Sequence, residues 1–154
     1  MVEIIRYASP MSKRLVLMRH GHAQQAAEDY IRPLSSKGRE AAAQSAEEFS
    51  GSGLRFDAVL SSSARRALST AEIVCKHCRI PGPEERRDLY LAPASDYLDA
   101  LRSLPDARSC VLLVAHNPGI SELARRLLGL PISPAPAEYA SELFDIDSWR
   151  QLGQ

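Results

Sequence analysis

The sequence has no excess of either charge, because 19 lysine and arginine residues are balanced by 19 aspartate and glutamate residues. A neutral chain has no global field that would attract nucleic acid or anionic lipid. Its longest apolar run, residues 110–115, falls far short of the roughly 20 residues that cross a membrane. We therefore expect neither nucleic acid nor a membrane among its partners.

Features of exported proteins are also missing. Residues 1–10 include charged side chains and have no long apolar segment followed by a small-residue cleavage site. Three cysteines, an odd number, do not form a disulfide framework. Cys75 and Cys78 are interpreted as buried apolar residues, since no second cysteine pair completes a zinc site. Together these absences indicate a cytoplasmic protein.

What remains is the composition of an ordinary globular protein: 154 residues, 45% of them hydrophobic and 25% charged, with 8 glycines and 10 prolines. A chain of this length buries enough surface to need no disulfide or metal for stability. We predict a single domain over residues 1–154, in which residues 1–12 are a candidate N-terminal extension.

Short apolar runs alternate along the chain with segments of helical spacing. The runs are typical of strands buried on both faces of a sheet, and they cover residues 14–18, 56–60 and 110–115. The helical segments are residues 36–49, 65–78, 95–104 and 119–128. Residues 142–147 alternate like a half-buried edge strand, and the proline-rich residues 131–136 form a connector. This order predicts a three-layer α/β/α fold with a central, mostly parallel sheet.

Basic residues follow each of the three predicted strands. In a parallel α/β sheet, the loops after the carboxyl ends of the strands build the ligand site. Here these loops are residues 19–22 (Arg-His-Gly-His), 61–66 (Ser-Ser-Ser-Ala-Arg-Arg) and 116–119 (His-Asn-Pro-Gly). Arginine offers a planar fork to phosphate, and neutral histidine is a nucleophile. Convergence of these side chains would support phosphoryl transfer through a phosphohistidine intermediate.

Four segments resemble the histidine phosphatase (phosphoglycerate-mutase-like) superfamily, in the order in which that family has them. Residues 15–21 (Leu-Val-Leu-Met-Arg-His-Gly) resemble its RHG signature, and residues 29–38 resemble the segment leading into its first helix. Residues 62–72 are similar to its second-arginine segment and residues 113–119 to its second-histidine segment. Leu89 and Tyr90 also fit the short, SixA-type branch, whose members are phosphohistidine phosphatases.

The resemblance implies roles for four residues. His20 would be the nucleophile, Arg19 and Arg66 would clamp the phosphate, and His116 would bind a phosphoryl oxygen. It further implies a phosphatase that needs no metal or cofactor. The residues placed in substrate binding are Gly21, His22, Ser62 and Asn117. Arg65 falls at a variable position and is expected to face solvent.

The sequence differs from the family at Ser63, Ser69 and His22, where the family often has other residues. None of these differences removes a charged residue from the phosphate site, so they affect the expected substrate contacts more than the expected chemistry. A general acid is also hard to identify. Many members use a carboxylic acid between the second arginine and the second histidine, and the candidates here are Glu84, Glu85 and Asp88, of which Asp88 is retained. Because a phosphoramidate leaves as imidazole and needs less help than an alkoxide, the weak acid motif favours phosphohistidine on a protein as the substrate.

Other interpretations stay open. The protein could act on a small phosphorylated molecule, as a phosphomonoesterase or a phosphoglycerate-type mutase, or it could be a phosphate-binding regulatory module without turnover. Tyr90 and Tyr97 are interpreted as packing residues, and residues 84–88 as a solvated surface.

Overall fold

Three of the predicted strands lie side by side in a five-stranded sheet. The computed structural model describes residues 12–129 and 131–154. The strands are β1 (Lys13–Arg19), β2 (Ala58–Ser62), β3 (Glu84–Arg86), β4 (Cys110–Ala115) and β5 (Tyr139–Phe144). Their order is β3-β2-β4-β1-β5, in which β5 alone is antiparallel to its neighbour. The predicted mostly parallel sheet is confirmed.

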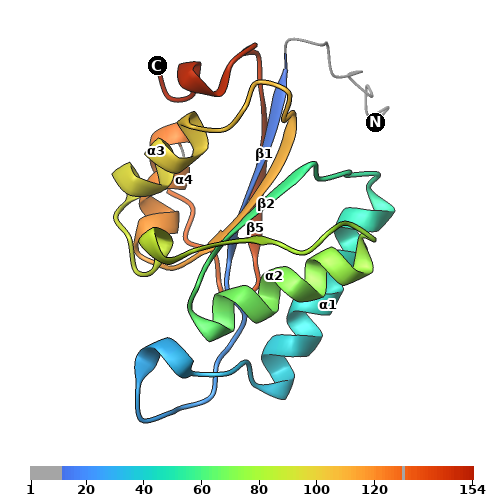
Figure 1. Cartoon of the computed structure of the whole chain (residues 1–154), viewed down its shortest axis with the longest axis vertical. Helices are drawn as coiled ribbons and strands as arrows, with labels where there is room; N and C mark the ends of the chain where they lie inside the picture. The colour runs from blue at the N-terminus through green and yellow to red at the C-terminus, as the bar shows by residue number, and fades with distance from the viewer. Residues whose placement is uncertain (1–11, 130) are drawn as a thin grey trace.

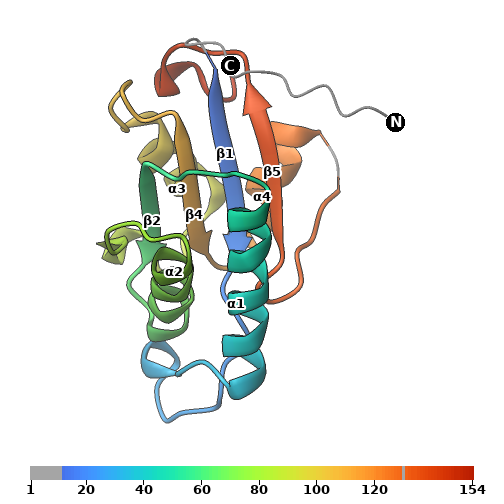
Figure 2. The ribbon, with the colours of Figure 1, turned by 90° about the vertical axis from the view of Figure 1, so that its right-hand side faces the viewer.

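Helices cover both faces of this sheet, as the three-layer prediction requires. α1 (Ser36–Gly51) and α2 (Arg65–His77) lie on one face, and α3 (Ala94–Arg102) and α4 (Gly119–Leu128) on the other (Figures 1 and 2). Short 3-10 helices occur at η1 (Asp29–Ile31), η2 (Arg87–Leu89) and η3 (Trp149–Gln151). No helix of residues 12–129 and 131–154 is long and apolar enough to cross a membrane.

The continuous apolar character of β1 follows from burial on both sides. Leu15 and Leu17 pack in the core beneath α3 and α4, whereas Val16 and Met18 pack in the core beneath α1 and α2. Successive side chains of a strand point to opposite faces, so a strand covered on both faces needs apolar residues at every position.

Two strand boundaries and one whole strand differ from the prediction. β2 starts at Ala58 instead of residue 56 and extends to Ser62. β5 covers residues 139–144 instead of 142–147, because it pairs along the length of β1, from Met18 opposite Tyr139 to Lys13 opposite Phe144. β3 lies within residues 84–88, where we expected only solvated surface. Its glutamates are exposed, and pairing with β2 rather than an apolar pattern makes it a strand.

The loop after β1 is held against the first turn of α1. Ser35 caps α1 by accepting a hydrogen bond from the Gly38 N–H group. A Cβ atom on Gly38 would lie 2.1 Å from the carbonyl oxygen of His22. Glycine therefore permits the close approach that places the loop following His20. The candidate extension, residues 1–12, lies outside the described residues except for Ser12.

Candidate active site

The carboxyl ends of β1, β2 and β4 meet at one edge of the sheet. Arg19 at the end of β1 pairs with Ala115 at the end of β4, and the His20 N–H group donates to the Ala115 carbonyl oxygen at 3.1 Å. This register brings the next residues of both strands together, and the rings of His20 and His116 have centroids 5.1 Å apart. Parallel pairing thus joins two histidines that are far apart in sequence.

His20 presents a free ring nitrogen toward Arg66. Its Nδ1 lies 2.8 Å from the Gly21 carbonyl oxygen, which can only accept, so Nδ1 carries the hydrogen. Its Nε2 therefore holds a lone pair and accepts from Arg66 Nε at 3.4 Å. Burial, assisted by the positive charges of Arg66 and Arg19, lowers the pKa of His20 to about 4. The imidazole is neutral at pH 7.

His116 is more deeply buried, with 1% of its surface exposed. Arg66 Nη2 lies 3.4 Å from its Nδ1, so Nδ1 is the acceptor and Nε2–H donates to Ser62 Oγ at 2.7 Å. Burial is the main cause that lowers its pKa to about 3, with His20 and Arg66 contributing. A neutral His116 therefore keeps one N–H group directed at Ser62.

Arg66 is the centre of the cluster. It lies in the first turn of α2, is only 3% exposed, and contacts both histidines. The end of its guanidinium group contacts Asp29: Nη1 donates to the Asp29 carbonyl oxygen at 2.8 Å and Nη2 to Oδ2 at 3.0 Å. Arg65, the neighbouring arginine, is exposed as predicted.

Arg19 has donors that the protein itself uses little. Its buried Nε has no hydrogen-bond partner in the described part of the chain, and its Nη1 makes only a 3.4 Å contact with the Pro134 carbonyl oxygen. A buried donor without a hydrogen-bond partner destabilises the folded state. A bound anion would accept from this cationic donor and remove that cost. The contact with Pro134 also places the connector of residues 131–136 beside the site.

Of the four predicted substrate-binding residues, Ser62 joins the cluster through His116. The Gly21 N–H group donates to Thr70 Oγ1 at 3.0 Å, which fixes the loop onto α2. The His22 side chain is exposed and contacts Ser35 Oγ at 2.7 Å. Asn117 Oδ1 accepts from the backbone N–H and hydroxyl of Ser121 in α4. Asn117 thus bonds the first turn of α4 and His22 contacts the Ser35 cap of α1, so their substrate contacts stay predictions.

The retained general-acid candidate, Asp88, is exposed and forms a two-point ion pair with Arg86, at 2.9 Å from Nε and 2.6 Å from Nη2. This partner lowers the pKa of Asp88. A general acid must be protonated near neutral pH, so the geometry does not favour this role, which stays a prediction. Glu84 and Glu85 are exposed on β3.

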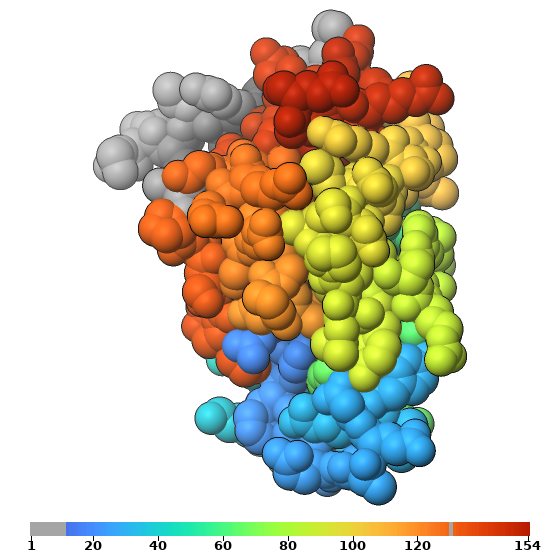
Figure 3. Space-filling model, turned by 90° about the vertical axis from the view of Figure 1, so that its left-hand side faces the viewer, coloured from blue at the N-terminus to red at the C-terminus, as the bar shows by residue number. Residues whose placement is uncertain are grey.

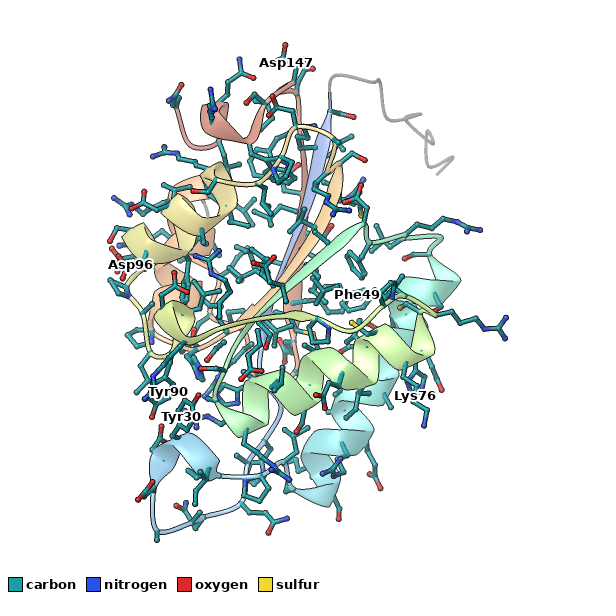
Figure 4. The ribbon with its side chains drawn as sticks, in the orientation of Figure 1. Tyr30, Phe49, Lys76, Tyr90, Asp96 and Asp147 are labelled. Carbon is teal, nitrogen blue, oxygen red and sulfur yellow. The ribbon has the colours of Figure 1, made fainter. Side chains whose placement is uncertain are left out.

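Two residues of the site were missed or misassigned from sequence. Asp29, which contacts Arg66, was named only as the first residue of the family-like segment 29–38 and was given no role in the site. Tyr90 was interpreted as a packing residue, but its hydroxyl donates to Asp29 Oδ2 at 2.5 Å and its ring lies 5.6 Å from that of His116. Figure 4 shows Tyr90 beside Tyr30, at the end of the molecule opposite Asp147. Tyr97, in contrast, is fully buried as expected.

Within residues 12–129 and 131–154, no group of three or more histidine, cysteine or acidic side chains is arranged to hold a metal ion. Cys75 is buried and unpaired, and burial raises its pKa to about 11. This agrees with its interpretation as a buried apolar residue, whereas Cys78, which was expected to be buried as well, is only partly buried.

Comparisons with known proteins show similarity first at the level of sequence. A family model described as the histidine phosphatase superfamily (branch 1) matches residues 15–90. An uncharacterized protein of Picosynechococcus sp. (strain PCC 7002) is 33% identical over 120 residues, which cover 73% of this chain and 72% of that protein.

Solved structures of SixA proteins share the fold. The putative phosphohistidine phosphatase SixA from Nakamurella multipartitia superposes with a TM-score of 0.78 at 28% identity, covering 93% of this chain and 90% of that one. The protein histidine phosphatase SixA in complex with tungstate gives a TM-score of 0.77 at 28% identity, covering 83% and 86% of the two chains.

Proposed function

The chain belongs to the histidine phosphatase superfamily and is a phosphatase, and from this premise we propose that it dephosphorylates phosphohistidine on a protein through a phospho-His20 intermediate. One observation carries the proposal: Arg66 lies within 3.4 Å of a ring nitrogen of both His20 and His116. A nucleophile, a cation and a second imidazole thus surround one point at the edge of the sheet. The SixA relative in complex with tungstate, an oxyanion of similar shape to phosphate, supports the same type of ligand.

In the first step, the lone pair on His20 Nε2 attacks phosphorus. The new Nε2–P bond forms as the P–N bond of the substrate breaks, and the departing imidazole keeps that electron pair and takes up a proton from solvent water. Arg66 Nε leaves His20 and binds a phosphoryl oxygen. Arg19 and His116 bind the remaining oxygens and stabilise the charge of the transition state.

In the second step, water attacks the phosphorus of phospho-His20. The Nε2–P bond breaks, His20 regains its lone pair and inorganic phosphate leaves with the water oxygen. We propose that both steps are metal-independent, since Arg19 and Arg66 supply the positive charge.

The acids near the site support a phosphoramidate substrate. An alkoxide leaving group needs a protonated acid, which a raised pKa would provide. The pKa of Asp29 is instead lowered to about 2, chiefly by the hydrogen bond from Tyr90, and that of Asp88 is lowered by Arg86. Both carboxylates are ionised at pH 7. Imidazole leaves with less assistance, so phosphohistidine suits this site better than a phosphate ester.

The partner is accordingly a phosphohistidine-bearing protein. We place the reaction in the cytoplasm, where Cys75, Cys78 and Cys110 would stay as the free thiols that they are here. A small phosphorylated molecule remains the second class of substrate, and a screen of phosphate esters distinguishes the two.

Trapping of the intermediate tests the mechanism. The protein is incubated with phosphoramidate in EDTA, and acid-labile phosphate is mapped by mass spectrometry. We expect phosphate on His20, none in His20→Ala, and unchanged labelling in His77→Ala, which removes an exposed histidine on α2. His116→Ala should slow hydrolysis and raise the steady-state level of label.

The outcomes separate the alternatives. Label on another residue, or turnover without label even in His116→Ala, would contradict the His20 mechanism. Phosphate binding with neither label nor turnover would indicate the regulatory module.

A further inference from the structure

Asp29 holds the Nη1–Nη2 end of the Arg66 guanidinium group, next to the Nε–Nη2 edge that contacts the two histidines. Its backbone oxygen accepts from Nη1 at 2.8 Å and its Oδ2 accepts from Nη2 at 3.0 Å. Both terminal nitrogens of the guanidinium group are therefore bound by one residue. Among residues 12–129 and 131–154, Asp29 is also the one carboxylate that forms an ion pair with Arg66.

The Nε–Nη2 edge of the same guanidinium group contacts the two histidines. Nε lies 3.4 Å from His20 Nε2, and Nη2 lies 3.4 Å from His116 Nδ1. A guanidinium group is planar with its donors in a fixed fork, so holding one edge determines where the other edge points. We propose that Asp29 is a positioning residue that directs the Nε–Nη2 edge of Arg66 at the phosphoryl group. This inference rests on the proposed function of Arg66.

Asp29 is itself held by two aromatic residues. The Tyr90 hydroxyl donates to Oδ2 at 2.5 Å, and the Tyr90 ring meets the Tyr30 ring edge to face at 5.0 Å. Arg87 lies over the Tyr30 ring at 5.2 Å. These contacts join η1 to the segment that follows β3, and Figure 3 shows the two segments against each other in blue and yellow-green. Two loops that are distant in sequence thus support one carboxylate.

The exposure of the two partners indicates where a substitution would act. The Asp29 side chain is 45% exposed, and an exposed ion pair by itself contributes little to stability. Arg66 is 3% exposed, so loss of its carboxylate would leave a buried cation without its ionic partner. The effect of Asp29→Ala should therefore be centred on Arg66 and the anion it binds, and the stability of the variant has to be measured together with binding.

Binding of orthovanadate, measured by calorimetry, tests the inference independently of turnover. We expect Asp29→Ala to weaken vanadate binding about tenfold, which is the size of loss found at metal sites when a group that orients a ligand is removed. Because Asp29 acts through Arg66, the double variant Asp29→Ala/Arg66→Ala should bind no more weakly than Arg66→Ala alone. Glu28→Ala, which removes the neighbouring exposed carboxylate, is the matched control and should bind like the wild type.

Kinetics with phosphoramidate provide the second readout. Asp29→Ala should lower kcat more than it raises KM, because directing Arg66 matters most in the transition state. Asp29→Asn keeps an acceptor for Nη2 and should recover part of the lost rate. Far-UV circular dichroism and thermal melting of each variant show whether the fold is retained.

Three results would overturn the inference. Wild-type affinity for vanadate in Asp29→Ala would show that Arg66 needs no positioning, and additive losses in the double variant would show that Asp29 acts elsewhere. Tighter vanadate binding in Asp29→Ala would show that Asp29 competes with the anion. If the wild type binds vanadate but never forms phospho-His20, the proposed function fails, whereas the double-variant comparison still decides the role of Asp29.

Discussion

The hydroxyl of Ser62 orients the His116 ring, whose tautomer is set by Arg66. Ser62 is fully buried, and its Oγ accepts from His116 Nε2 at 2.7 Å and from the Ala64 N–H group at 3.2 Å. With Nε2–H engaged, Nδ1 is left to accept from Arg66. The neighbouring Ser63 is also buried, but its Oγ has no hydrogen-bond partner in the described structure. Two adjacent buried serines thus differ in whether their hydroxyl groups are hydrogen-bonded.

This difference makes a matched pair of variants. Ser62→Ala should slow phosphatase turnover about tenfold, because His116 loses the group that orients it. Ser63→Ala should leave turnover unchanged and should not destabilise the fold, since it removes a polar group that is buried without a partner. Steady-state phosphate release and thermal melting measure the two effects. Equal rates for the two variants would contradict the orienting role of Ser62.

At the scale of elements, the loop after β1 depends on how closely it approaches α1. Gly38 lies in the first turn of α1, and an added Cβ would meet the His22 backbone at 2.1 Å. Gly51, the last residue of the same helix, has nothing within 4 Å of an added Cβ. The positions share a helix and differ in their surroundings.

Alanine substitutions at these two glycines should therefore change the free energy of unfolding differently. Gly38→Ala should lower the free energy of unfolding by about 1–3 kcal/mol, because backbone must move to admit the methyl group. It should also slow phosphorylation of His20, since the displaced loop carries that residue. Gly51→Ala should be neutral or stabilising by up to about 1 kcal/mol. Urea unfolding measures both, and a fully stable, active Gly38→Ala protein would refute the close-approach explanation.

At the scale of the whole molecule, the site couples folding to pH. The pKa of His20 is lowered from 6.5 to about 4 and that of His116 from 6.5 to about 3. Between those values and 6.5 the unfolded chain binds protons at both positions and the folded chain does not. Stability consequently decreases as the pH falls through this window, and neither histidine contributes such a loss above about pH 6.5.

Melting temperatures between pH 8 and pH 4 should show this loss in the wild type. His116→Asn removes one of the two groups, so its melting temperature should fall less steeply below pH 6.5. His77→Asn, at an exposed position, should keep the wild-type slope. An unchanged slope in His116→Asn would mean that this histidine is protonated in the folded state as readily as in the unfolded chain.

Much of the architecture could be predicted from the residues alone. The apolar runs that became β1 and β4 identify strands buried on both faces, and the periodicity of residues 36–49 and 119–128 identifies α1 and α4. Because parallel strands end at a common edge, the sequence also predicted that His20, Arg66 and His116 would meet. The structure brings these three side chains together. Their chemical roles stay predictions until the intermediate is trapped.

The tertiary structure alone decided the contacts that no local pattern records. β3 has charged residues and no periodicity, and it is a strand only because β2 offers an edge. The limits of β5 follow from the length of β1. Asp29 lies 37 positions from Arg66 and 61 from Tyr90. Local sequence determines strands and helices through propensity and burial pattern, whereas a hydrogen bond between distant side chains depends on the path of two loops in space.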